Sequence, residues 1–157
     1  EAGETLIEVQ GHAKAVTNLA SLPGGKLASA SKDGLVRLWD VAAATAGAVL
    51  DAAAGAVTSL AAVRDGRLAG GYQDGGVRLW DTDSASEVAL LKAGGGQVWC
   101  LLTHGDFLVA GYEAGVLRVW DWEAAKESSA LKSHPRPPPA SRASAPAASP
   151  VAPPTAP

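Results

Sequence analysis

Short stretches in which apolar and polar residues alternate recur through the first 132 residues of the chain. The clearest stretch covers residues 34–40 and reads Gly-Leu-Val-Arg-Leu-Trp-Asp. It returns with small changes at residues 75–81 and again at residues 115–121. A period of two is typical of a β-strand, because successive side chains point to opposite faces. The chain is therefore expected to be rich in strands.

The repeated stretch belongs to a longer unit, since its Trp-Asp pairs begin at residues 39, 80 and 120. Each unit of about 40 residues holds four short apolar runs separated by turns that contain glycine. A repeat of that length and content is typical of one blade of a β-propeller. Closed propellers have about four to eight blades. The sequence thus predicts an all-β fold, a partial β-propeller of three four-stranded antiparallel blades.

The composition divides the chain into a repeat region, residues 5–132, and a tail, residues 133–157. The three blades are expected at about residues 10–51, 52–92 and 93–132. Residues 5–9 alternate like an outer strand and are assigned to a preceding blade. Nine of the ten prolines follow residue 134, mixed with Ala and Ser. Such sequence without periodicity predicts a disordered Pro-rich tail.

Several residues of the first repeat carry a family resemblance, namely Gly11-His12, Ser29, Asp33-Gly34 and Trp39-Asp40. With them, the chain resembles the Trp-Asp (WD) repeat family over about residues 5–134. In that family a His, a Ser or Thr, an Asp and a Trp form a buried hydrogen-bond network inside a blade. The resemblance implies such a network for these residues: His12, Ser29, Asp33 and Trp39.

The implied network becomes smaller along the chain. The second repeat keeps Asp74 and Trp80 at the matching positions, and the third keeps only Trp120. All three repeated tryptophans are expected to pack between blades, because a buried indole supplies a large apolar area. The third blade should therefore depend more on packing than the first does.

A Ser, a His and an Asp in one blade could also be interpreted as a nucleophilic triad. Ser29 lies within a predicted strand, however, and not on the exposed turn that a nucleophile needs. No motif for an oxyanion hole accompanies it, and the family that the chain resembles uses these residues structurally. We therefore expect no enzyme activity and no catalytic residue.

The net charge and the few His and Cys residues argue against several classes of protein function. The net charge is −3, and an acidic chain lacks the basic face that non-specific nucleic-acid binding needs. The histidines have no Cys or His at ligand spacing, so neither a metal nor another cofactor is expected. No apolar run is long enough for a membrane helix. The single cysteine, Cys100, favours an intracellular protein, cytoplasmic or nuclear.

Members of the resembling family mostly bind other proteins through a narrow face built from loops. Trp99 is the most conspicuous residue there, since its counterparts are Thr17 and Thr58. An exposed aromatic side chain is a candidate binding anchor, but packing at a strand end is the alternative, favoured for the two tyrosines. The candidate binding face comprises Lys14, Lys32, Tyr72, Gln73, Gln97, Trp99, Tyr112 and Glu113.

The function predicted from these features is a non-catalytic scaffold for protein–protein interactions, part of a larger propeller protein or assembly. One alternative is a fragment that completes a propeller by self-association through its open blade flanks. Another is the substrate-docking module of a ubiquitin ligase or of a protein that joins zinc fingers to WD repeats.

Overall fold

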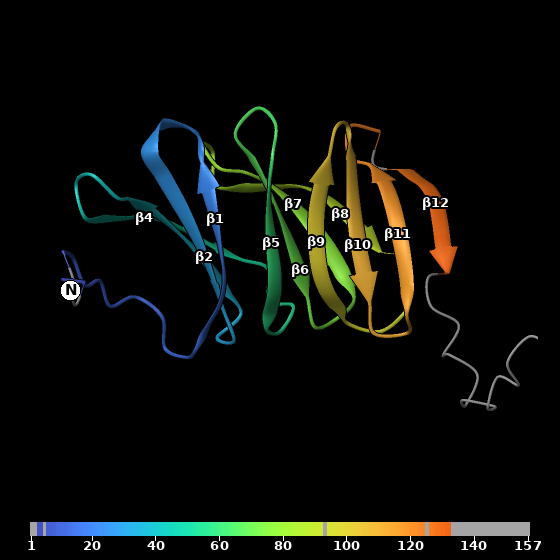
Figure 1. Ribbon diagram of the computed structural model, residues 1–157, viewed down its shortest axis with the longest axis horizontal. Coiled ribbons are helices and arrows are strands. Elements are labelled where there is room, and N and C mark those ends of the chain that lie inside the picture. The colour runs from blue at the N-terminus through green and yellow to red at the C-terminus, as the bar shows by residue number, and fades with distance from the viewer. Residues whose placement is uncertain (1–2, 5, 93, 125, 133–157) are drawn as a thin grey trace, which may run out of the picture.

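The computed structural model describes residues 3–4, 6–92, 94–124 and 126–132 (Figure 1). This part of the chain forms strands and one 3₁₀ turn, η1 (Pro23–Gly25). The first sheet contains β1 (Val16–Leu22), β2 (Lys26–Ser31), β3 (Leu35–Asp40) and β4 (Thr45–Asp51). The second contains β5 (Val57–Val63), β6 (Arg67–Tyr72), β7 (Gly76–Asp81) and β8 (Ser86–Lys92). The third contains β9 (Val98–His104), β10 (Phe107–Tyr112), β11 (Val116–Asp121) and β12 (Lys126–Lys132).

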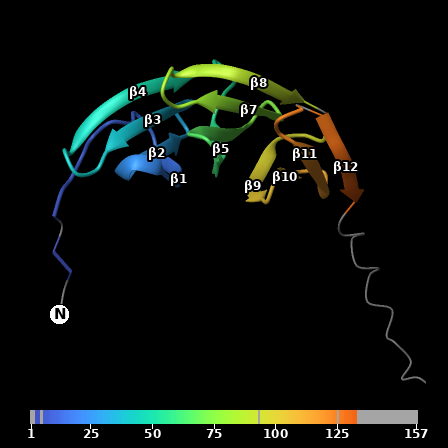
Figure 2. The same ribbon diagram turned by 90° about the horizontal axis from the view of Figure 1, so that it is seen from above.

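Each sheet is an antiparallel meander, in which every strand pairs with the next one along the chain. The sheets follow one another around an arch, with β1, β5 and β9 on its inner side and β4, β8 and β12 on its outer side (Figure 2). The all-β class and the three four-stranded antiparallel blades are therefore confirmed. The expected tail, residues 133–157, lies outside the described residues.

Turn chemistry explains two recurring sequence signals. The turn between the second and third strands contains Gly34 in the first blade and Gly75 in the second, with φ of 89° and 82°. A side chain at either position would be strained. The Asp of each Trp-Asp pair supports the next turn, since Oδ1 of Asp81 accepts the N–H groups of Asp83 and Ser84 at 3.0 Å each. Asp121 accepts two N–H groups in the same way in the third blade, and Asp40 accepts the N–H of Ala43 in the first.

The apolar core lies between neighbouring sheets and not inside one. Val36 and Leu38 of the first blade are buried in one cluster with Val57, Leu68 and Trp80 of the second. A second cluster joins the second and third blades in the same way and contains Trp120. Each blade is therefore stabilised mainly by the area that it buries against a neighbour.

Trp39 departs from the predicted burial of the three repeated tryptophans. Trp80 and Trp120 are each 4 % exposed, whereas Trp39 is only half-buried. The physical reason is position, because each of these side chains points toward the preceding blade, and none of the described blades precedes the first. Residues 5–9 were assigned above to the outer strand of such a blade, and residues 6–9, the described part of that segment, form no strand in this structure. A strand requires a paired neighbour, so that assignment stays a prediction.

Candidate functional site

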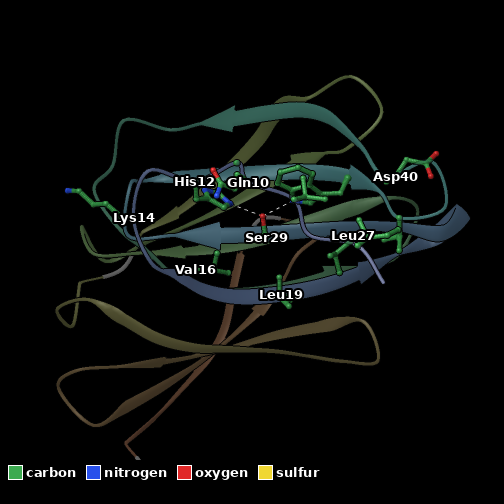
Figure 3. A pocket seen from close by; sticks show the side chains of 14 residues that line it. Gln10, His12, Lys14, Val16, Leu19, Leu27, Ser29 and Asp40 are labelled. Atoms are coloured by element: carbon green, nitrogen blue, oxygen red, sulfur yellow. Dashed lines mark hydrogen bonds between the residues drawn. The ribbon is translucent and has the colours of Figure 1, made fainter. Parts of the chain in front are cut away.

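The structure brings His12, Ser29, Asp33 and Trp39 together in the first blade. Figure 3 shows His12 next to Ser29. Nδ1 of His12 lies 3.0 Å from Oδ2 of Asp33, and Nε2 lies 2.7 Å from Oγ of Ser29. The indole N–H of Trp39 donates to the same Oγ over 2.8 Å. A carboxylate can only accept, so Nδ1–H of His12 donates to Asp33. Oγ of Ser29 accepts the indole N–H, which leaves the Ser29 hydroxyl proton free to be donated to Nε2. Each of the four side chains thereby has a hydrogen-bond partner within the network.

Asp33 anchors this network at the turn between β2 and β3. Burial raises the pKa of its carboxyl, but hydrogen bonds from the N–H groups of Leu35 and Ala13 and from His12 outweigh burial and hold the pKa below its ordinary value. The side chains of His12 and Asp33 are 4 % and 6 % exposed. The ionised carboxylate therefore fixes the loop before β1 to the turn after β2.

The order Asp33, His12, Ser29 is that of a nucleophilic triad, but its environment differs. Ser29 is 4 % exposed, and its oxygen already accepts a hydrogen bond from Trp39. A nucleophile needs an open approach and donors for the developing oxyanion. The geometry favours a structural network over a reacting one.

The second blade fills the matching space in another way. Gly70 takes the place of Ser29, and the ring of Tyr72 occupies the room, its hydroxyl oxygen 3.3 Å from where a Cβ on Gly70 would stand. Burial raises the pKa of Tyr72 to about 12, while the indole N–H of Trp80 acts against that rise without the geometry of a full hydrogen bond. The guanidinium of Arg78 lies 5.4 Å from the centre of the tyrosine ring.

Asp74, the other retained residue of the second blade, binds a different partner from that of Asp33. Its Oδ1 accepts the N–H of Gly76 at 2.8 Å, and its Oδ2 lies 3.1 Å from the Arg78 guanidinium. The turn is thus held by a carboxylate in both blades, but only the first blade connects it to a histidine. In the third blade Trp120 packs in the core beside Tyr112.

A groove of roughly 540 Å³ lies where the inner strands of the three blades meet. Trp99 on β9 borders it and is 60 % exposed. Its other predicted members lie on loops around it, and these are Lys14, Lys32, Gln73 and Gln97. The two lysines are exposed, and no acidic side chain belongs to the groove. The groove therefore presents positive charge, amide groups and one aromatic ring.

The other three residues of the predicted face lie elsewhere. Tyr72 is fully buried and Tyr112 is 4 % exposed, so neither belongs to a binding surface. Each tyrosine side chain lies between blades, in the space that glycine and alanine leave open in its own sheet. Glu113 is exposed beside the groove, and its N–H donates to the carbonyl of Gln97 at 3.0 Å.

Sequence reasoning missed the residues that form the floor of the groove, Thr17, Ala56, Val57 and Thr58. The hydroxyl of Thr17 donates to the carbonyl of Val57 at 2.7 Å and so connects two blades. Thr58 instead donates to the carbonyl of Gly71 within its own blade, at 3.0 Å. The alignment of both threonines with Trp99 was the available signal for this floor.

The described residues contain neither a metal cluster nor a membrane-spanning helix. No cluster of three or more His, Cys, Asp or Glu side chains among them could hold a metal ion. None of the helical segments described is both long and apolar enough to cross a membrane.

Known proteins resemble this chain in its repeat sequence and in its fold. Residues 3–40, 46–81 and 86–121 each match the family model described as WD domain, G-beta repeat. The crystal structure of the computationally designed Ika8 protein is similar, with a TM-score of 0.74 and 25 % identity. The similarity covers 82 % of this chain and 40 % of the designed one, so the chain spans less than half of that length. No curated protein sequence matches the chain.

Proposed function

Since the chain belongs to the WD domain, G-beta repeat family, we propose that it is a non-catalytic scaffold that holds another protein in the groove around Trp99. Repeats of this kind serve as platforms for protein interaction. The three blades would perform this work as part of a larger propeller, because three blades leave two flanks uncovered. The unpaired thiol of Cys100 agrees with work inside the cell.

The exposure of Trp99 is the observation that carries this proposal. A tryptophan that is 60 % exposed on the inner strand of a rigid sheet costs little entropy when it contacts a partner. Its counterparts Thr17 and Thr58 use their hydroxyls within the fold, whereas the indole of Trp99 faces the groove. This residue therefore has the properties of a binding anchor.

The positive charge of the groove indicates what kind of partner it binds. Lys14 and Lys32 are exposed on one side of it, and Gln73 and Gln97 add donors and acceptors. An extended peptide segment with a carboxylate next to an apolar side chain would pair with the lysines and pack on Trp99. The partner we propose is a protein that presents such an acidic segment.

A displayed library of short peptides tests this function directly. Peptides selected on the full chain are expected to be acidic and to lose binding to Trp99→Thr by about tenfold or more, as for other aromatic anchors. A Lys14→Glu, Lys32→Glu double variant should lose the same peptides, with a steeper loss at low salt. Trp99→Thr copies the residue of the other two blades, so its fold should be unchanged.

Val88→Asp is the matched control, since Val88 is 47 % exposed on the outer strand β8, far from the groove. It should bind the selected peptides like the unmodified chain. Peptides that bind Trp99→Thr as tightly as the unmodified chain would contradict the proposal.

A further inference from the structure

The side of the first blade that faces away from the second is exposed where the same side of the other blades is buried. Val16 is 54 % exposed, whereas its counterparts Val57 and Val98 are fully buried. Leu19 is 59 % exposed, and Leu60 is 5 % exposed. We call this side of the blade its leading face, defined in the first blade by Val16, Leu19, Leu27, Trp39 and Val41.

The leading face of the first blade is hollowed into a cleft of about 720 Å³ (Figure 3). Leu27 and Trp39 line it, and Ile7 and Val9 of the N-terminal segment contribute to it as well. The absence of a side chain at Gly11 allows this segment to lie close to Trp39, because a Cβ on residue 11 would stand 2.8 Å from Cζ2 of that ring. The cleft is thus a largely apolar surface, and none of the blades that the structure describes covers it.

The third blade has the complementary open flank, which we call its trailing face and define by Leu102, Phe107, Val109, Leu117 and Val119. Leu102 is 62 % exposed, whereas its counterpart Ala61 is 8 % exposed. The first-blade counterparts of Val109, Leu117 and Val119 are all buried against the second blade. These counterparts are Ala28, Val36 and Leu38. The trailing face of the third blade therefore carries apolar residues at the positions that form interfaces elsewhere in the chain.

At the edge of each of the two internal interfaces, a basic residue of the trailing face contacts the next blade. Nζ of Lys26 lies 3.4 Å from Oδ1 of Asp83 between the first and second blades. The guanidinium of Arg67 lies 5.3 Å from the ring centre of Trp122 between the second and third. In each interface a basic residue that begins the second strand meets the leading face of the next blade.

On the open flanks of the first and third blades, the residues at the positions of both contact partners are apolar. Phe107 takes the position of Lys26 and Arg67 and is 41 % exposed. Val41 takes the position of Trp122 and is 51 % exposed, and Ala42 takes that of Asp83. If the two flanks met, no unpaired charge would be buried at this edge.

We propose that the trailing face of the third blade of one copy packs on the leading face of the first blade of a second copy. The contact repeats the geometry of the internal interfaces, since matching positions meet in the same order. It is a head-to-tail contact, which forms a closed ring when the rotation between copies fits. Two copies would place six blades in the ring, within the usual four to eight. The inference rests on the proposed assembly into a larger propeller and is independent of the groove.

His104 is the position at which the match is incomplete. Its counterparts Leu22 and Val63 are 5 % and 6 % exposed on their trailing faces, while His104 is exposed. A polar ring at this place weakens an apolar contact. His104→Leu is therefore expected to tighten the association of two copies.

Light scattering on the full chain tests the proposal. The expected mass is twice the 15.8 kDa of one chain. Val16→Asp and Leu102→Asp, on opposite flanks, should each weaken dimerisation by about tenfold or more, because each places a charge in the contact. Val88→Asp changes an equally exposed valine on the outer strand β8 and should leave the mass unchanged. Circular dichroism establishes that each variant keeps its strands.

A charge pair gives the second test. Phe107→Lys and Ala42→Asp should each weaken the dimer, and the double variant should recover it, because it recreates the contact between Lys26 and Asp83. A monomeric mass for the unmodified chain would overturn the inference while leaving the peptide result for Trp99 intact. Dimers that persist in Val16→Asp, or a double variant weaker than both single ones, would also overturn it.

Discussion

The ring of Tyr72 fills the space beside Gly70, with ring atom Cε2 at 3.0 Å from where a Cβ on residue 70 would stand. Gly70→Ala should therefore destabilise the chain, although alanine suits a strand better than glycine does. The added methyl group must displace a ring that is fully buried in the core. The expected cost is about 1–3 kcal/mol, measured from the midpoint of unfolding in urea.

Gly3→Ala is the control for this measurement, since nothing lies within 4 Å of a Cβ placed on residue 3. It should leave the midpoint of unfolding unchanged. Equal midpoints for the two variants would mean that the tyrosine ring moves aside at no cost, and the tight contact would then carry no weight.

Tyr72 also predicts how stability depends on alkaline pH. Burial raises its pKa in the folded chain to about 12, and a tyrosine in an unfolded chain has a pKa of about 10. The folded state thus holds the proton more tightly than the unfolded state does. Its contribution is complete below pH 10 and is lost as pH rises toward 12, at roughly 1.4 kcal/mol per pH unit.

The comparison that isolates this group is Tyr72→Phe, which keeps the ring and removes the hydroxyl. Unfolding in urea at several pH values between 9 and 12 should give a shallower decline for the variant than for the unmodified chain. Parallel declines would show that the hydroxyl of Tyr72 ionises equally well in both states.

The sequence predicted the blades because every blade repeats the same local chemistry. Alternation places Val36 and Leu38 on one side of β3, and the Trp-Asp pair marks where the strand ends. The burial of Trp80 and Trp120 follows from that register once neighbouring blades are assumed. The sequence could also have predicted that Thr17 and Trp99 lie around one groove, since each is the second residue of an inner strand.

Contacts between different blades could not be predicted from the sequence in the same way. Tyr72 and Tyr112 end their strands next to loops, and packing was the interpretation favoured for both, but the sequence did not indicate that their rings lie between blades. The space for the ring of Tyr72 depends on the small residue in the neighbouring position of the strand, which is Gly70 in the second blade and Ala110 beside Tyr112 in the third. The half-exposure of Trp39 depends on a covering blade, and its own strand contains no signal for that.

The hydrogen bond from Thr17 to Val57 predicts how the first two blades separate. Thr17→Val removes the only atom of this side chain that donates, and the expected loss is about 0.5–1.5 kcal/mol. Because the bond crosses between blades, hydrogen exchange should accelerate in β1–β4 more than in β5–β12. Thr58→Val removes a bond within the second blade and should not accelerate exchange selectively in β1–β4. Uniform acceleration in Thr17→Val would contradict this account.

His12→Ala decides whether the network of the first blade is structural. The substitution leaves the Asp33 carboxylate and the Ser29 hydroxyl without their shared partner, at an expected cost of about 1–3 kcal/mol in urea unfolding. The pKa of Asp33 is lowered in the folded chain, so its contribution is present above the ordinary carboxyl pKa of about 4 and is lost as pH falls below that. His12→Ala should reduce this acid sensitivity because it removes one of the groups that lower the pKa.

Lys14→Ala is the control for this variant, because Lys14 lies on the same loop and is exposed. It should melt like the unmodified chain at every pH. If instead His12→Ala kept full stability and abolished a hydrolytic activity, the trio would be catalytic. The hydrogen bond that Ser29 already accepts from Trp39 argues for the structural outcome, since that bond lowers the basicity of the hydroxyl oxygen and occupies one side of it.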